Sequence, residues 1–85
     1  MTTEEITKFI EKSPENSYVK ISFKKRDSIY GLFVKGKDHI ELSAKNFWRI
    51  VTKSHLDEYK KTKNMNLAKI FNGAEFSKLG TIDKP

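Results

Sequence analysis

The first apolar positions of the chain follow the period of a helix. They stand three and four residues apart on one side of it: Ile6, Phe9 and Ile10. Thr2 and Glu5 have capping-box spacing, so we expect the helix to begin at Thr2 or Thr3. The residue before a proline avoids the helical region, so Ser13-Pro14 should end it. A helix this short is marginal alone, so its apolar side must cover another element.

The next segments alternate between apolar and polar residues, as strands do. Residues 19–24 predict a strand with one apolar and one basic side: Val19, Ile21 and Phe23 against Lys20, Ser22 and Lys24. A polar turn over 25–27 leads to a second strand at about 28–35, whose two sides are both mainly apolar. We therefore expect that strand to be central and covered on both sides. An interior glycine requires a bend or a close backbone approach, and we expect Gly31 to mark the bend.

Shorter patterns follow in the second half of the chain. Ile40 and Leu42 predict a third strand, and the β-branched and aromatic residues of 47–51 predict another. Residues 55–63 predict a short surface helix, with Ser54 and Asp57 at capping positions. The segment 67–71 fits a helix or a strand. We favour two strands, 67–71 and 74–79, joined by a hairpin turn at Asn72-Gly73.

Two spacings in these segments resemble the Sm-like family of small bent β-barrels. The first motif of that family is matched by alternating apolar residues, a glycine and a turn aspartate: Val19, Ile21, Phe23, Ile29, Gly31, Phe33 and Asp38. The second is matched by Phe71-Asn72-Gly73, Phe76 and Leu79. The resemblance implies a bent barrel behind an N-terminal helix. At the positions of the family's RNA-site asparagine and arginine, this chain has Glu41 and Asn72.

The elements together predict one α+β, mainly β, domain over residues 1–85. An N-terminal helix precedes a strongly bent antiparallel meander or small barrel, Sm-like or SH3-like, with a short additional helix near 55–63. We expect residues 1–2 and 80–85 to be loose tails.

Composition narrows the class of protein. The chain has no cysteine, which excludes disulfides and thiolate chemistry. It has no apolar run of about 18 residues and no secretory signal pattern, so we expect a cytoplasmic protein without a membrane partner. Its two histidines stand far apart in the sequence, and no catalytic motif is present. We therefore expect neither an enzyme nor a cofactor.

The charge of the chain indicates what it binds. The net charge is +6, and nine of the seventeen Lys and Arg residues fall within residues 17–53 against three acids, so this middle segment attracts polyanions. Cations interleaved with aromatic rings suit phosphate contact and base stacking. The candidate binding residues are Tyr18, Lys20, Lys24, Lys25, Arg26, Lys45, Trp48, Arg49 and Asn72. Adjacent strand residues face opposite sides, so only one of Phe47 and Trp48 can be in the core.

Two functions remain open at this point. The first is a basic binding module that contacts RNA or single-stranded DNA through the Lys/Arg and aromatic side of the meander. The alternative is a protein-interaction or self-assembling scaffold, because sheets of this kind expose edge strands and tryptophan, tyrosine and arginine dominate interfaces.

Overall fold

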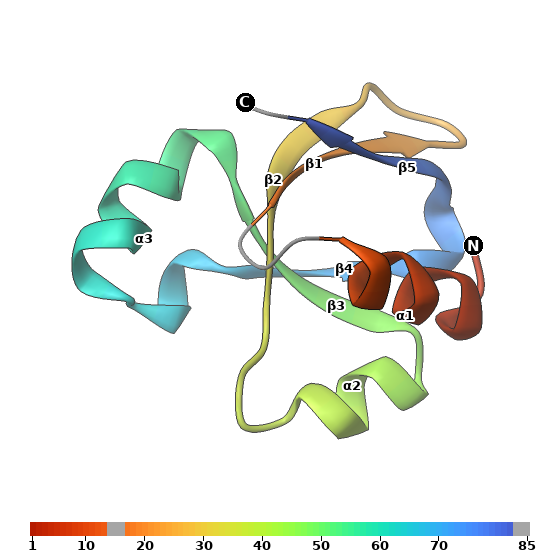
Figure 1. Ribbon diagram of the computed structural model, residues 1–85, viewed down its shortest axis with the longest axis horizontal. Coiled ribbons are helices and arrows are strands. Elements are labelled where there is room, and N and C mark those ends of the chain that lie inside the picture. The colour runs from red at the N-terminus through yellow and green to blue at the C-terminus, as the bar shows by residue number, and fades with distance from the viewer. Residues whose placement is uncertain (14–16, 83–85) are drawn as a thin grey trace.

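The computed structural model describes residues 1–13 and 17–82, and in that range it has the predicted α+β, mainly β, architecture (Figure 1). The helix α1 spans Thr3–Lys12 and has the predicted capping box between Thr2 and Glu5. It is followed by β1 (Tyr18–Phe23), β2 (Ile29–Val34), α2 (His39–Ala44) and β3 (Phe47–Thr52). The chain continues through α3 (Leu56–Thr62), β4 (Lys69–Asn72) and β5 (Phe76–Ile82). Single 3₁₀ turns lie at Lys53–His55, Met65–Leu67 and Gly73–Glu75.

The five strands form one antiparallel sheet in the order β4-β3-β2-β1-β5. The predicted meander is therefore present, and β2 is central as expected. The sheet is strongly curved (Figure 1), but it is not closed into a barrel, because β4 and β5 remain its two edges. The barrel alternative of the sequence prediction is corrected in this respect.

One side of the sheet packs against α1. The apolar stripe of α1 meets every second residue of the strands, and the fully buried members of this core are Ile6, Ile21, Trp48, Ile50 and Phe76. Phe9 and Ile10 pack against the same cluster. Alternation in the strands and helical spacing in α1 thus build a common core, as the sequence predicted.

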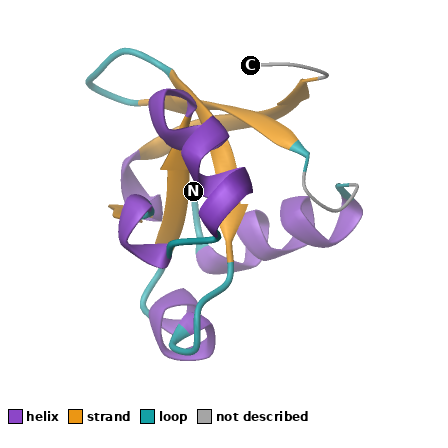
Figure 2. Cartoon of the chain, turned by 90° about the vertical axis from the view of Figure 1, so that its left-hand side faces the viewer, coloured by secondary structure: helices purple, strands orange, loops and turns teal. Residues whose placement is uncertain are grey.

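The opposite side of the sheet is only half covered. Leu32 and Val34 of β2 and Val51 of β3 pack beneath α3, which contributes the buried Leu56. Farther along the same side of β2, Tyr30 is 37% exposed. The predicted cover on both sides of β2 therefore holds for the half of the strand near α3. Figure 2 shows the β1–β2 turn projecting away from all three helices.

The predicted third strand at Ile40 and Leu42 is wrong, because residues 39–44 form α2. Two apolar residues are too short an alternation to distinguish a strand from a helical turn, and Ile40 is 82% exposed. The helix is tied to α1, since Thr3 Oγ1 donates a 2.8 Å hydrogen bond to the Ser43 carbonyl. The predicted helix near 55–63 is confirmed as α3, but Ser54 makes no side-chain cap to it.

The predicted hairpin at Asn72-Gly73 is also wrong. Both strands exist, but β4 pairs with β3 and β5 pairs with β1, so they occupy opposite edges of the sheet. A 3₁₀ turn joins them, and Gly73 within it donates to the Asn46 carbonyl at 2.8 Å. The curvature of the sheet allows one short connection to span both edges.

The predicted loose tails are corrected where the structure describes them. Residues 80–82 belong to β5 and pair with β1, while residues 83–85 lie outside the described part of the chain. At the other end, the Met1 amino group donates to the carbonyls of Gly73 and Phe76 at 3.0 and 2.8 Å. None of the described helices is long and apolar enough to cross a membrane.

Candidate nucleic-acid interface

The uncovered half of the second sheet side is formed by three adjacent strands, β2, β1 and β5. Strand register places Lys20 of β1 between Tyr30 of β2 and Gly80 of β5, and places Ser22 beside Lys78. Directly paired residues of neighbouring antiparallel strands share one side of the sheet. We call this surface the open face and define it by Lys20, Ser22, Tyr30, Lys78 and Gly80.

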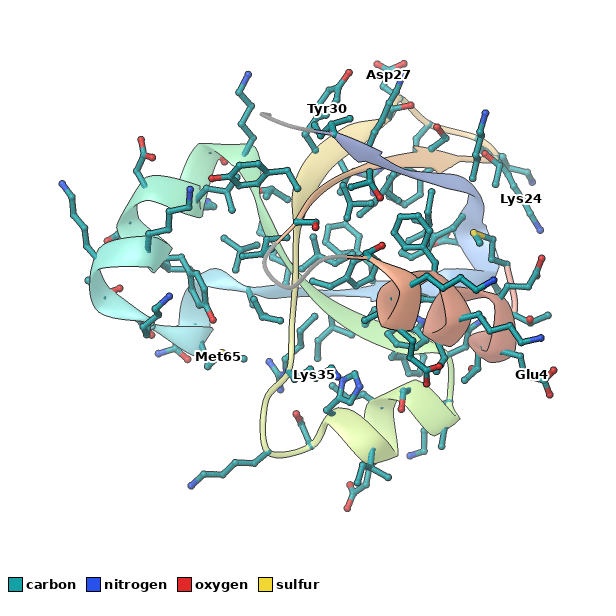
Figure 3. The ribbon with its side chains drawn as sticks, in the orientation of Figure 1. Glu4, Lys24, Asp27, Tyr30, Lys35 and Met65 are labelled. Carbon is teal, nitrogen blue, oxygen red and sulfur yellow. The ribbon has the colours of Figure 1, made fainter. Side chains whose placement is uncertain are left out.

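Tyr30 is the aromatic centre of the open face. Its side chain points away from the core, on the outer side of the β1–β2 half of the sheet (Figure 3). Apart from its chain neighbours, nothing lies within 4 Å of the position that a Cβ would take at Gly80, so the site beside Lys20 on β5 is open. A tyrosine ring beside an open site can stack on a planar base.

Tyr18 lies at the border between the open face and α3. The ring of Tyr18 packs against the buried cluster beneath α3 that contains Leu32, Val34 and Val51. The ammonium group of Lys60 in α3 sits 4.5 Å from the centroid of that ring. This cation–π contact places another positive charge at the edge of the open face.

The β1–β2 turn extends the positive surface beyond the strands. Lys24, Lys25 and Arg26 are all exposed there, as the sequence predicted. The backbone N–H of Lys24 donates a 3.0 Å hydrogen bond to the Glu75 carbonyl, which ties the turn to the β4–β5 connection. Figure 3 shows Lys24 and Asp27 directed outward from this region.

The cations of the open face and the turn are not neutralised by neighbouring acids. Among residues 1–13 and 17–82, the one ion pair joins Arg49 to Asp38, away from this surface. The exposed cations of the open face, the turn and the adjoining end of α3 are Lys20, Lys24, Lys25, Arg26, Lys60 and Lys78. Asp27 and Glu75 are the acids in the turn and in the connection beside it. The surface therefore retains an excess of positive charge that attracts phosphate groups.

Trp48 does not belong to this surface. It is 2% exposed and lies in the α1 core, where its Nε1 donates a 2.8 Å hydrogen bond to Asn46 Oδ1. Its indole meets Phe33 and His39 edge-on, with centroids 6.1 and 6.0 Å apart. The sequence left core and surface open for Trp48, and the structure places it in the core. We remove it from the candidate interface.

Arg49 is engaged in a bidentate ion pair. Its Nη2 lies 2.7 Å from Asp38 Oδ2 and its Nε lies 3.1 Å from Asp38 Oδ1. The hydrogen bonds from Arg49 hold the pKa of the Asp38 carboxyl below its usual value. This pair connects the β2–α2 loop to β3, so we assign Arg49 to the fold and not to ligand contact.

The remaining two predicted residues are exposed but lie elsewhere. Lys45 caps the C-terminus of α2, at the opposite end of the molecule from the β1–β2 turn (Figure 1). Asn72 ends β4, and its Oδ1 accepts a 2.9 Å hydrogen bond from the Ala74 N–H. The structure therefore groups Tyr18, Lys20, Lys24, Lys25 and Arg26, and separates them from the other four candidates.

Three residues of the surface were missed from the sequence: Tyr30, Lys60 and Lys78. The alternation of residues 28–35 contained Tyr30 but could not show that its half of the strand is uncovered. Lys78 joins Lys20 only because β5 pairs with β1, a contact between residues far apart in the sequence. Lys60 was visible only as a charge at the end of a helix.

No group of three or more His, Asp or Glu side chains in residues 1–13 and 17–82 gathers as a metal site requires. His39 is partly buried against Trp48, and this burial lowers the pKa of its imidazole.

Comparisons of the chain with protein-family models, curated proteins and solved structures found no match.

Proposed function

We propose that the protein is a small non-enzymatic module that binds single-stranded RNA or DNA on its open face. The observation that carries the proposal is the position of Tyr30, exposed beside Lys20 and continuous with Lys78 across three paired strands. Phosphate contacts supply most of the affinity in such complexes, and aromatic rings add stacking that tolerates any base.

The geometry supports a single strand better than a duplex. The open face presents strands with one exposed tyrosine and has no helix or ribbon to enter a groove. In a duplex the faces of the bases are already stacked on one another and are not free to stack on a side chain. An unpaired strand can lay its bases on Tyr30 while its phosphates meet the lysines of β1 and β5. The turn cations then continue the phosphate path past the end of β1.

The affinity for labelled single strands should fall steeply as salt rises. Each phosphate contact contributes a slope of roughly 0.7 in a plot of log affinity against log salt, so replacing both Lys20 and Lys78 with alanine should lower the slope by about 1.4.

Tyr30→Ala should weaken binding by about five- to thirtyfold at constant salt, because it removes one stacking contact. Fluorescence anisotropy with RNA and DNA strands of one sequence measures both effects.

Replacing both Lys37 and Lys45 with alanine is the matched control for charge. Both lysines are exposed, one after the far end of β2 and the other at the end of α2, so their loss removes the same charge elsewhere. The control should leave the slope nearly unchanged. Absence of binding to either type of strand at low salt would rule out the proposed function.

Self-assembly is a second candidate, favoured by the edges of the sheet. Strand β4 pairs on one side only, and Ile70 in its middle is 50% exposed. Unpaired edge strands with an exposed apolar residue are common templates for pairing with another chain. A second copy, or another protein, could extend the sheet there, and such assembly is compatible with nucleic acid on the open face.

Assembly through β4 should give a solution mass well above the 9.9 kDa of one chain. Ile70→Lys should then return the mass to that of a monomer, because a charge on the edge disfavours pairing. Ile40→Lys is the matched control, since Ile40 is exposed on α2 and not on an edge strand. Light scattering over a range of concentrations measures this. A monomer at every concentration contradicts assembly.

A further inference from the structure

A notch lies where the β1–β2 turn meets the connection between β4 and β5. Its volume is about 260 Å³, and its lining residues are Phe23, Lys24, Lys25, Arg26, Ala74 and Glu75. The hydrogen bond from the Lys24 N–H to the Glu75 carbonyl joins its two walls. The notch is too small for an extended chain, and its size suits one terminal group of a ligand.

The floor of the notch is held rigidly by the core. Phe23 is 9% exposed, and its ring packs against Phe76 and Phe71 with centroids 5.3 and 6.1 Å apart. The guanidinium carbon of Arg26 lies 4.7 Å from the centroid of the Phe23 ring. Contact with a buried ring restricts the position of the guanidinium, whose planar group donates paired hydrogen bonds to phosphate oxygens.

The charges around the notch match a doubly charged anion. Lys24, Lys25 and Arg26 contribute three positive charges and Glu75 one negative charge, which gives a formal charge of +2. None of these four residues forms an ion pair with another described residue. Asp27 follows in the turn but does not line the notch. A terminal phosphomonoester carries close to two negative charges near pH 7, whereas an internal phosphodiester carries one.

We propose that this notch binds the terminal phosphorylated nucleotide of a nucleic-acid strand. The three cations contact the phosphomonoester, and the exposed Ala74 contacts the sugar attached to it. Phe23 and Lys20 lie on opposite sides of β1, so the rest of the strand passes round the β1–β2 turn to reach the open face. This inference rests on the proposed function and adds that the protein distinguishes phosphorylated ends from hydroxyl ends.

The test compares strands of one sequence that differ only at their ends. A strand with a terminal phosphate should bind about five- to tenfold more tightly than the same strand with hydroxyl ends, since several exposed charge pairs each contribute modestly. Strands phosphorylated at the 5′ end and at the 3′ end form separate arms. A gain in either arm supports the proposal and assigns the polarity. A gain in neither arm overturns it.

Variants of the lining residues test whether the gain in affinity from a terminal phosphate arises at the notch. Arg26→Ala should abolish the gain, and Arg26→Lys should reduce it, because lysine keeps the charge but loses the planar paired donors. Lys37→Ala should retain the full gain. Lys20→Ala together with Lys78→Ala should weaken both kinds of strand alike. A gain that survives Arg26→Ala and the double change Lys24→Ala with Lys25→Ala would place the phosphate elsewhere and refute the site.

The dependence on pH is a further readout. A phosphomonoester has its second pKa at about 6, so the gain should shrink as pH falls below that value. A gain unchanged at about pH 5 contradicts recognition of the dianion. Equal binding of all strands leaves the proposed function standing and removes only this inference, whereas no binding at low salt removes both.

Discussion

Replacing Trp48 with alanine should lower the free energy of unfolding by about 3–5 kcal/mol, the range for truncating a large buried aromatic side chain. Trp48 is 2% exposed and lies between Phe33 and His39 in the α1 core. The truncation also leaves Asn46 Oδ1 without its donor. Because small domains have total stabilities of about 5–15 kcal/mol, the variant should be close to unfolding. Chemical denaturation followed by circular dichroism measures the change.

The indole N–H gives this residue a second, separable role. Asn46 has a left-handed backbone conformation, with φ of 64°, and its side-chain amide donates to the Met1 carbonyl at 2.8 Å. Trp48→Phe keeps an aromatic ring but removes the donor to Asn46. It should therefore cost less than the alanine variant, about 1–3 kcal/mol. A loss below about 1 kcal/mol for Trp48→Ala would contradict its place in the core.

Gly31→Ala should destabilise the protein by about 1–3 kcal/mol, because the added methyl group has no room. A Cβ at this position would lie 2.6 Å from the Val51 carbonyl oxygen and 2.9 Å from Ile50 Cγ2. The first of these is backbone of β3 and can move only if the β2–β3 pairing moves. The φ angle of Gly31 is not in the left-handed region, so space and not backbone conformation is the reason for glycine.

Gly80→Ala provides the matched control for this prediction. Gly80 also lies within a strand, but nothing approaches within 4 Å of its Cβ position. Alanine should be neutral or stabilise the protein by up to about 1 kcal/mol, because it reduces the freedom of the unfolded chain. Denaturant unfolding of the Gly31→Ala and Gly80→Ala variants measures both changes in the free energy of unfolding. Equal effects at the two positions would show that close packing does not explain the loss at Gly31.

The local pattern of the sequence was sufficient for most of the individual elements. The capping box at Thr2 and Glu5 marked the start of α1, because that motif is formed by residues three apart. Alternation over Val19, Ile21 and Phe23 identified both β1 and its buried side. The sequence could not identify α2, since Ile40 and Leu42 make too short a pattern to distinguish the two-residue repeat of a strand from the 3.6-residue repeat of a helix. The resemblance to the Sm-like family stays a prediction.

The candidate surface was predictable only in its contiguous part. Lys24, Lys25 and Arg26 follow one another along the chain, and Tyr18 and Lys20 share one side of a single strand. Their grouping therefore required only local structure. Trp48 and Arg49 carry the same residue types but are used within the molecule, one in the core and the other in the pair with Asp38. Residue type alone does not reveal whether a side chain already has a partner.

The sequence by itself determined the helix α1, the strands β1, β2 and β3, and the positive charge of the first hairpin, because hydrophobic period, capping and charge are properties of neighbouring residues. Only the tertiary structure decided that β4 and β5 lie on opposite edges, that Lys78 joins Lys20 beside Tyr30, and that Glu75 closes the notch at Arg26. These contacts join residues about 45 to 60 positions apart. Such pairings depend on the curvature and strand order of the whole sheet, which no local pattern encodes.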